Sequence, residues 1–221
     1  MSALFITGTD TGVGKTFVAC ALAIALRERG RRVAVLKPVE TGVEGEPADA
    51  LALRAASLDP APLDDICPYR LRAPLAPAVA ARLESVTIDV TRLVALVARR
   101  RQEADVLLIE GAGGLLVPLD ARTTWAELAA RAGLPLLIVG ANRLGVVNHC
   151  ALTARVAAAA GLVVRGFVLS QRAARTDVSA ATNAETIATL TGLPCCAALP
   201  RCTNPAVAAR RFDLDTLFWP S

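Results

Sequence analysis

Residues 6–16 read ITGTDTGVGKT, and the end of this stretch has the residue types of a phosphate-binding loop. The usual pattern is G-x-x-x-x-G-K-[ST], but Thr9 stands where the first glycine belongs, and Gly8 lies one residue too early. The Gly-Lys-Thr ending follows an apolar run of strand length and opens an amphipathic stretch. This context indicates a nucleotide site with unusual spacing rather than an ordinary strand-to-helix turn.

The loop offers three kinds of group to a nucleotide. Backbone N–H groups of Gly12, Val13 and Gly14 can point towards an anion, and the following helix adds its positive N-terminal end. Lys15 can reach the β- and γ-phosphates, and the Thr16 hydroxyl can ligate Mg²⁺. Because Mg²⁺ prefers several oxygen ligands, Thr16 alone is insufficient.

Two carboxylates are candidates to complete such a metal site. Glu110 ends a buried apolar run, and Asp49 opens a predicted helix, where a capping role explains it equally well. The only histidine, His149, stands beside Asn148 at a predicted helix start, where local capping is commoner than acid–base chemistry. Neither a Ser/His/Asp set nor a Cys/His metal spacing occurs in the sequence.

The lysines form a second signal, because 22 of the 24 basic residues are arginine and only Lys15 and Lys37 are lysine. A compact ammonium on a flexible stem fits where a planar guanidinium does not. Lys37 ends a predicted strand, just before Pro38. A second cation there can stabilise charge on a transferring phosphoryl group, so both lysines are predicted catalytic residues.

Apolar runs and amphipathic stretches alternate along the chain and predict the elements that position these residues. Strands are expected at residues 4–7, 33–36, 106–109, 136–139 and 164–169, and helices at 16–29, 91–103, 125–131, 148–160 and 179–190. The pattern predicts an α/β fold, a single domain over 1–221 with a doubly wound, mostly parallel sheet flanked by helices. The proline-rich residues 60–77 are expected to form a surface excursion.

In such sheets ligands bind at the carboxyl ends of the strands. The polar or glycine-rich segments 8–14, 37–42, 110–114 and 142–149 each follow a predicted strand, so we expect them to converge on one edge.

Composition narrows the function classes. Net charge is +4, but no basic block exceeds Arg99-Arg100-Arg101, which favours solvated helix ends over nucleic-acid binding. The six cysteines form no C-x-x-C pair, so free thiols in a reducing cytosol are expected. No signal peptide precedes the first strand, and the apolar runs are too short to span a bilayer, so a cytoplasmic protein without a membrane partner is predicted.

Five motifs of the chain resemble those of one family, the dethiobiotin synthetases, and occur in the family's order. They are residues 7–16, Lys37-Pro38-Val39 with Thr41-Gly42, residues 49–53, residues 110–114, and Leu144-Gly145 with Asn148-His149. The resemblance runs from Ala3 to about Leu169 and implies the P-loop NTPase type of fold. The early Gly8 is then the family's own spacing.

The resemblance implies the chemistry. Carbon dioxide adds to the N7 amine of 7,8-diaminopelargonate, ATP phosphorylates the carbamate, and the second amine attacks the resulting mixed anhydride to close the cyclic urea of dethiobiotin. Carbamate and γ-phosphate are both anions, which accounts for Lys15 and Lys37. Thr16, Asp49 and Glu110 are implied to hold Mg²⁺.

The resemblance also implies two sets of binding residues and a homodimer, in which residues 144–148 reach the partner's substrate. The nucleotide set is Gly12, Val13, Gly14, Lys15, Thr16, Phe17, Asp49, Glu110, Gly111, Ala112, Gly113, Ser170, Gln171, Pro200, Arg201 and Cys202. The substrate set is Thr11, Lys37, Thr41, Leu144, Gly145, Val146, Val147 and Asn148.

Two departures from the family pattern affect specificity. Ser170-Gln171 stands where the family often carries an adenine-reading asparagine, which leaves the choice of base open. Residues 183–186 lack the tyrosine that some members place near the distal carboxylate of the substrate, and no replacement can be assigned.

Two other readings are disfavoured. Dimeric ATPase switches of the partitioning or septum-positioning type carry a lysine five residues before the loop lysine, where this chain has Asp10. A cobyrinate-type amidotransferase needs a glutaminase domain, for which 221 residues leave no room.

Overall fold

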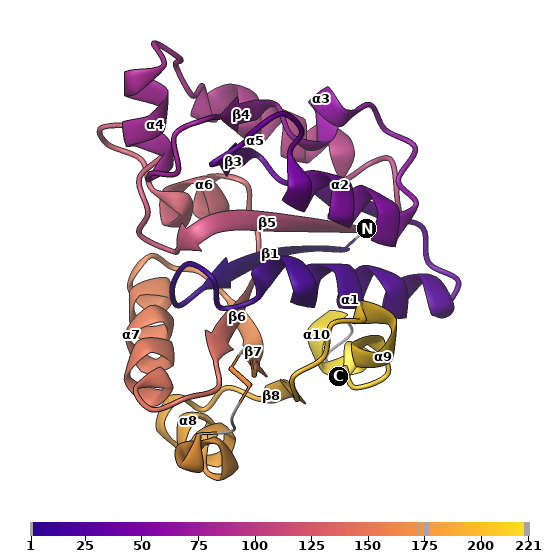
Figure 1. The fold of residues 1–221 in the computed structure, drawn as a ribbon, viewed down its shortest axis with the longest axis vertical. Coiled ribbons are helices and arrows are strands. Elements are labelled where there is room, and N and C mark those ends of the chain that lie inside the picture. Colours follow the sequence, from indigo (N-terminus) through magenta and orange to yellow (C-terminus); the bar gives the residue numbers. More distant parts are fainter. Residues whose placement is uncertain (1, 172, 175–176, 219–221) are drawn as a thin grey trace.

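The centre of the computed structural model, which describes residues 2–171, 173–174 and 177–218, is a parallel six-stranded sheet (Figure 1). Its strand order is β2-β5-β1-β6-β7-β8, and every neighbouring pair is parallel. The strands are β1 (Ser2–Gly8), β2 (Val33–Leu36), β5 (Val106–Gly114), β6 (Leu136–Ala141), β7 (Val164–Ser170) and β8 (Cys195–Leu199). The predicted fold class is confirmed.

Both faces of the sheet are buried under helices, and successive side chains of a strand point to opposite faces. In β1, Leu4 and Ile6 join one apolar cluster, while Ala3 and Phe5 join another. The first cluster is covered by α1 (Lys15–Glu28), α2 (Ala48–Ser57), α9 (Pro205–Ala209) and α10 (Leu214–Phe218). The opposite face is covered by α5 (Val90–Arg100), α6 (Trp125–Arg131), α7 (Val146–Ala159) and α8 (Asn183–Thr191).

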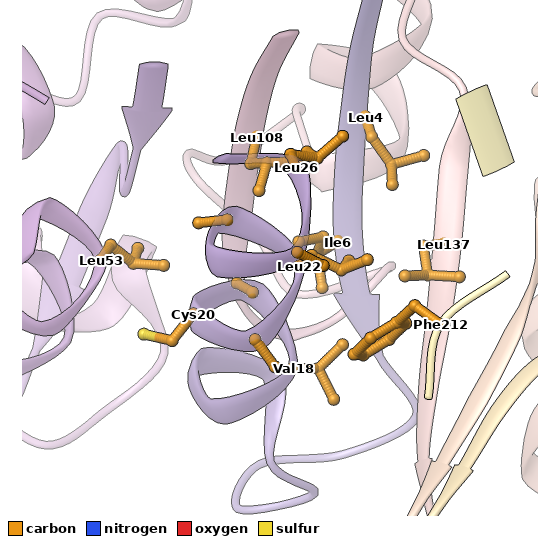
Figure 2. Close-up of a cluster of buried hydrophobic side chains, with 14 of the residues drawn as sticks. Leu4, Ile6, Val18, Cys20, Leu22, Leu26, Leu53, Leu108, Leu137 and Phe212 are labelled. Atoms are coloured by element: carbon orange, nitrogen blue, oxygen red, sulfur yellow. The ribbon is translucent and has the colours of Figure 1, made fainter. Parts of the chain in front are cut away.

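Helix α1 is enclosed on more than one side, which explains its strongly apolar sequence. Figure 2 shows Val18, Leu22 and Leu26 of this helix among side chains of the sheet, with Leu53 of α2 nearby. Because the helix is fixed in this way, the phosphate-binding segment in front of it has a rigid support.

The prediction of a surface excursion at residues 60–77 is wrong. This segment contains α3 (Leu63–Ile66) and β4 (Tyr69–Leu71), which pairs in parallel with β3 (Val39–Thr41) to form a second, two-stranded sheet. Ile66, Cys67 and Leu71 are buried. Elements of three or four residues between prolines are too short to show a hydrophobic period. Helix α4 (Pro77–Leu83) follows.

The remaining differences lie near the carboxyl-terminal third of the chain. Strand β8 was not expected, because its sequence CCAAL lacks the branched residues that favour strands. The helix expected at 179–190 is divided into a 3₁₀ turn, η1 (Val178–Ala181), and α8. Within the described residues, no helix is long and apolar enough to cross a membrane.

Candidate active site

A cavity of about 670 Å³ lies at the carboxyl ends of β1, β2 and β5. It brings together twelve of the predicted site residues: Thr11, Gly12, Gly14, Lys15, Thr16, Phe17, Lys37, Thr41, Asp49, Glu110, Ala112 and Gly113. Its other lining residues are Glu40, Pro74, Leu75, Ala76, Pro77 and Val117. Three of the four segments expected at this edge therefore share one cavity.

The phosphate-binding segment folds back over its own lysine. The ammonium of Lys15 donates a hydrogen bond to the carbonyl of Asp10, with 3.0 Å between the two atoms. A Cβ at Gly8 would lie 2.7 Å from that carbonyl oxygen and 2.8 Å from the Lys15 Nζ. Gly14, the N-cap of α1, has φ 99°, a conformation that glycine adopts readily. Glycine is thus required at the early position as well as at the end of the loop.

Lys15 is 7% exposed, and burial lowers its pKa to about 8, although Glu110 nearby favours the charged form. The neighbouring Lys37 ammonium lowers this pKa further. An ammonium whose charge is poorly compensated attracts an anion strongly. Its position at the N-terminus of α1 suits a phosphate group.

The side chains of the three predicted metal ligands, Thr16, Asp49 and Glu110, lie close together. Glu110 of β5 is 1% exposed, and its Oε1 accepts hydrogen bonds from the Thr16 hydroxyl at 2.9 Å and from the Lys37 ammonium at 2.5 Å. Asp49 of α2 accepts a hydrogen bond from the same ammonium at 2.9 Å. The second carboxylate oxygen of Glu110 is buried and has no hydrogen-bond partner within the described part of the chain.

This arrangement fits Mg²⁺. Its donors are a hydroxyl and two carboxylates, the oxygen ligands that this ion prefers, and the unpartnered Glu110 Oε2 is a buried acceptor that a cation would satisfy. The residues described contain no group of three or more His, Cys, Asp or Glu that could hold a metal. When Mg²⁺ is bound, Thr16, Asp49 and Glu110 would hold it, and phosphate oxygens and water would complete its ligands, as is usual for this ion.

The charged side chains around Lys37 affect the pKa values of Lys37 and Asp49. Burial by itself would lower the pKa of Lys37, but Glu110 and Asp49 outweigh it, and the pKa of this ammonium is raised. Burial would likewise raise the pKa of Asp49, but the Lys37 ammonium outweighs it and holds that pKa below its usual value. At neutral pH Lys37 and Asp49 therefore form an ion pair.

Glu40 is a site residue that the sequence reasoning missed. Its two carboxylate oxygens accept hydrogen bonds from the backbone N–H groups of Asp49 and Ala50, each at 3.0 Å. The capping role considered for Asp49 therefore belongs to Glu40, and the Asp49 side chain is free to face Lys37. Burial raises the pKa of Glu40, against the effect of the two N–H donors. A single sequence contains no signal that connects residue 40 to residue 49.

Gly111 does not line the cavity but lies in the part of β5 that supports it. A Cβ there would lie 2.8 Å from the ring of Phe5. The indole N–H of Trp125 donates to the carbonyl of Ala112 at 2.8 Å, which fixes the strand end beside the cavity. Val13 is buried and also does not line the cavity.

The residues expected to read the base lie elsewhere on the same edge. Ser170 ends β7 and is buried, and the backbone N–H of Gln171 donates to the carbonyl of Leu199, which ends β8. Pro200, Arg201 and Cys202 directly follow β8. None of these five lines the cavity that holds Lys15.

The segment 144–148 contains Leu144, the N-cap Gly145 and the first residues of α7, and it does not line the cavity either. Leu144 is 80% exposed, whereas Val146 is buried, so the side chain of Val146 faces the core. Asn183 holds the start of this turn: its amide donates to the Asn142 side chain at 2.9 Å and to the Arg143 carbonyl at 3.4 Å.

Comparison with known proteins adds three findings. A protein-family model described as an AAA domain matches residues 2–207. The ATP-dependent dethiobiotin synthetase BioD of Anaeromyxobacter dehalogenans (strain 2CP-1) is 48% identical over 98% of this chain and 97% of the relative. The enzyme of the same name from Marinobacter nauticus is 36% identical, with 96% of each chain covered.

Among solved structures, chloroplast FtsY from Physcomitrella patens is similar to this chain with a TM-score of 0.50 and 17% identity. The match covers 94% of this chain and 64% of FtsY. At that identity it shows a shared fold alone.

Proposed function

The chain belongs to the ATP-dependent dethiobiotin synthetase family, and from this premise we propose that it closes the cyclic urea of dethiobiotin in biotin biosynthesis. Its substrates are 7,8-diaminopelargonate, carbon dioxide and ATP. The observation that carries the proposal is the placement of Lys15 and Lys37 in one cavity with Thr16, Asp49 and Glu110. That cavity can hold two anions against each other, which a carbamate and a γ-phosphate require.

Different residues of the chain have different roles in the proposed reaction. The loop from Gly12 to Thr16 binds and orients the phosphates, and the Lys15 ammonium provides a positive charge beside the β- and γ-phosphates. Lys37 stands at the end of β2 and stabilises the negative charge that the phosphoryl group and the carbamate share. Thr11 and Thr41 line the same cavity and hold the carbamate or its parent amine through their hydroxyl groups.

We propose Mg²⁺ as the metal, held by Thr16, Asp49 and Glu110. When bound, Mg²⁺ neutralises phosphate charge and supplies Lewis acidity at the transferring group. The support is the oxygen donor set and the buried, unpartnered oxygen of Glu110.

We also propose a homodimer, because the predicted substrate segment 144–148 lies outside the cavity of its own chain. Leu144, Leu116 and Leu152 are more than half exposed, and Leu116 and Leu152 line a second cavity of about 460 Å³ beside Thr11. Exposed leucines that share one surface cavity, as Leu116 and Leu152 do, favour an interface. Leu152→Glu is expected to yield monomers in light scattering and to raise KM for the diamine; an unchanged dimer would contradict this assignment.

The reaction is tested by incubating the protein with diaminopelargonate, bicarbonate, Mg²⁺ and each nucleoside triphosphate in turn. Phosphate release and the mass of the product are followed together. We expect a product of dethiobiotin mass and phosphate release that depends on the diamine. Nucleotide hydrolysis that ignores the diamine would instead indicate an ATPase switch and sink the ligase proposal.

The same panel determines the choice of base. We propose that Ser170, Gln171, Pro200, Arg201 and Cys202 surround it, because they follow β7 and β8 at the edge where ligands of parallel sheets bind. A cytoplasmic location is proposed with it, in keeping with six cysteines that are all free thiols.

A further inference from the structure

The ammonium of Lys37 lies where the three metal-ligating side chains meet. It contacts Glu110 Oε1 at 2.5 Å and Asp49 Oδ2 at 2.9 Å, and Lys37 is 3% exposed. Glu110 Oε1 also accepts the Thr16 hydroxyl. The Lys37 ammonium, which the proposed reaction needs beside the substrate, is therefore hydrogen-bonded to the carboxylates that are proposed to hold the metal.

Lys15 provides the contrast inside the same cavity. Its ammonium bonds to a neutral backbone carbonyl, that of Asp10, and no ion pair joins it to a carboxylate among the residues described. The two lysines thus differ in partner although they share type, charge and cavity. Lys37 is the one held by the metal-ligating groups.

A divalent cation and an ammonium at the same two carboxylate oxygens repel each other strongly, so the two cations compete for Asp49 Oδ2 and Glu110 Oε1. Among the buried side-chain oxygens of this cluster in the described part of the chain, Glu110 Oε2 is the one without a hydrogen-bond partner. For Asp49 Oδ2 and Glu110 Oε1 to ligate a metal, Lys37 must release them. Its side chain is the flexible four-carbon stem that such a movement needs.

We propose that Lys37 is an internal cation that occupies the metal position of the free protein, and that metal binding releases it towards the substrate. The site then holds a positive charge between Asp49 and Glu110 at every stage. The released ammonium becomes available for the carbamate and γ-phosphate only when the metal is in place. The direction of that release rests on the proposed function, whereas the competition between Lys37 and the metal does not.

The competition is tested with Mn²⁺, which takes similar oxygen ligands, titrated by electron paramagnetic resonance without nucleotide or diamine. Lys37→Met removes the competing ammonium and keeps an unbranched side chain. We expect Mn²⁺ affinity to rise about tenfold or more, because hydrogen bonds from an ammonium to carboxylates are charge-assisted and strong. Lys15→Met, the matched control, removes one positive charge from the same cavity but no bond to Asp49 or Glu110, and it should raise the affinity less.

An affinity in Lys37→Met that is unchanged, lower, or raised no more than in Lys15→Met would overturn the proposal. Lys37→Met leaves the buried Glu110 carboxylate without its ion-pair partner. A measurement on the wild-type protein therefore tests the proposal independently of this variant. The chain has two lysines, so isotope labelling of lysine gives two side-chain resonances, assigned with Lys15→Arg.

Adding Mg²⁺ with a non-hydrolysable nucleotide should shift the Lys37 resonance and expose its ammonium to faster hydrogen exchange. The nucleotide without metal should move chiefly the Lys15 resonance. A Lys37 resonance that the metal does not change would refute the release. These experiments contain no diamine, so failure of the ligase assay leaves their outcome intact and distinguishable.

Discussion

Two buried ammonium groups share one cavity, and their surroundings give them opposite properties. Lys15 faces a carbonyl, and burial lowers its pKa to about 8. Lys37 faces two carboxylates, which raise its pKa despite burial. The first is therefore suited to receive a phosphate, and the second remains charged while it moves between anionic partners.

Lys37→Arg tests the role of the compact ammonium. A guanidinium keeps the charge but is planar and larger, and Lys37 is 3% exposed, so the new side chain cannot reproduce both contacts. We expect kcat to fall by about a hundredfold or more, the usual loss when a transition-state donor is displaced. Nucleotide affinity, measured by calorimetry, should change little because the loop binds the phosphates.

Lys15→Arg is the matched comparison, and we expect it to weaken nucleotide binding instead. Near-wild-type turnover in Lys37→Arg, measured with diaminopelargonate at saturating ATP, would contradict the catalytic role of Lys37.

The proposed metal site depends on how the start of helix α2 is held. Helix α2 has no side-chain cap of its own, and Glu40 of β3 supplies two acceptors to its first turn. The second, two-stranded sheet thus connects the cavity wall to the helix that carries Asp49. This sheet adds Val39 and Leu71 to the core and also holds the start of the helix that carries Asp49, a proposed metal ligand.

Glu40→Gln replaces one of the two acceptors by an amide donor that would face a backbone N–H. We expect a lower melting temperature and, with nucleotide bound, Mg²⁺ affinity reduced several-fold, since Asp49 loses its fixed position. Glu46→Gln, an exposed position in the same connection, is the control and should change neither quantity. Unchanged Mg²⁺ affinity in Glu40→Gln would show that Asp49 is held by other contacts.

Helix α6 supports the site from the other face of the sheet and has a complete capping box. The Thr124 hydroxyl accepts from the N–H of Ala126, and the Glu127 carboxylate accepts from the N–H of Thr124. Thr124→Ala should lower the free energy of unfolding by about 1 kcal/mol in urea titrations. A change within error would mean that packing of Trp125 alone fixes the helix.

The same box predicts a pH dependence. Bonds to Thr124 hold the pKa of Glu127 below its usual value, so the folded protein favours the ionised carboxylate. This contribution is present above the ordinary carboxyl pKa and is lost as pH falls through the lower, folded-state pKa. Glu127→Gln should therefore reduce the acid-induced loss of stability, measured as melting temperature between neutral and acidic pH.

Elements with a clear hydrophobic period could be predicted from the sequence, and those without one could not. Strand β1 and helix α1 combine apolar runs with the glycine-rich turn, and their order specifies the site edge. Strands β3, β4 and β8 are short or built of small residues, so they exist through pairing with neighbours. The role of Glu40 depends on a contact across nine residues that no local pattern reveals.

The parallel sheet carries the candidate site at one edge and an apolar layer on each face, and most of the cysteines lie in those layers. Cys20, Cys67 and Cys196 join the cluster under α1, and Cys150 joins the one under α7. Burial raises the pKa of each of these four thiols to about 12. Cys195 and Cys202 are partly exposed.

The fold therefore predicts which thiols react. The thiolate is the nucleophile, and a pKa of about 12 leaves on the order of one thiolate in ten thousand at pH 8. In the native protein at pH 8 we expect iodoacetamide, followed by peptide mass spectrometry, to modify Cys202 fastest and Cys195 more slowly, because burial also raises the pKa of Cys195. The other four thiols should stay intact. Unfolding in urea should make all six reactive. Rapid labelling of Cys20 in native buffer would contradict the packing of α1.

Cys202 also makes this experiment a probe of the base site. If residues 200–202 surround the base as proposed, a bound nucleotide should slow alkylation of Cys202 and leave Cys195 unchanged, which provides the control within the same sample. Protection should follow the triphosphate that best supports product formation, because both depend on the same pocket. A nucleotide that supports turnover but gives Cys202 no protection would place the base away from the end of β8.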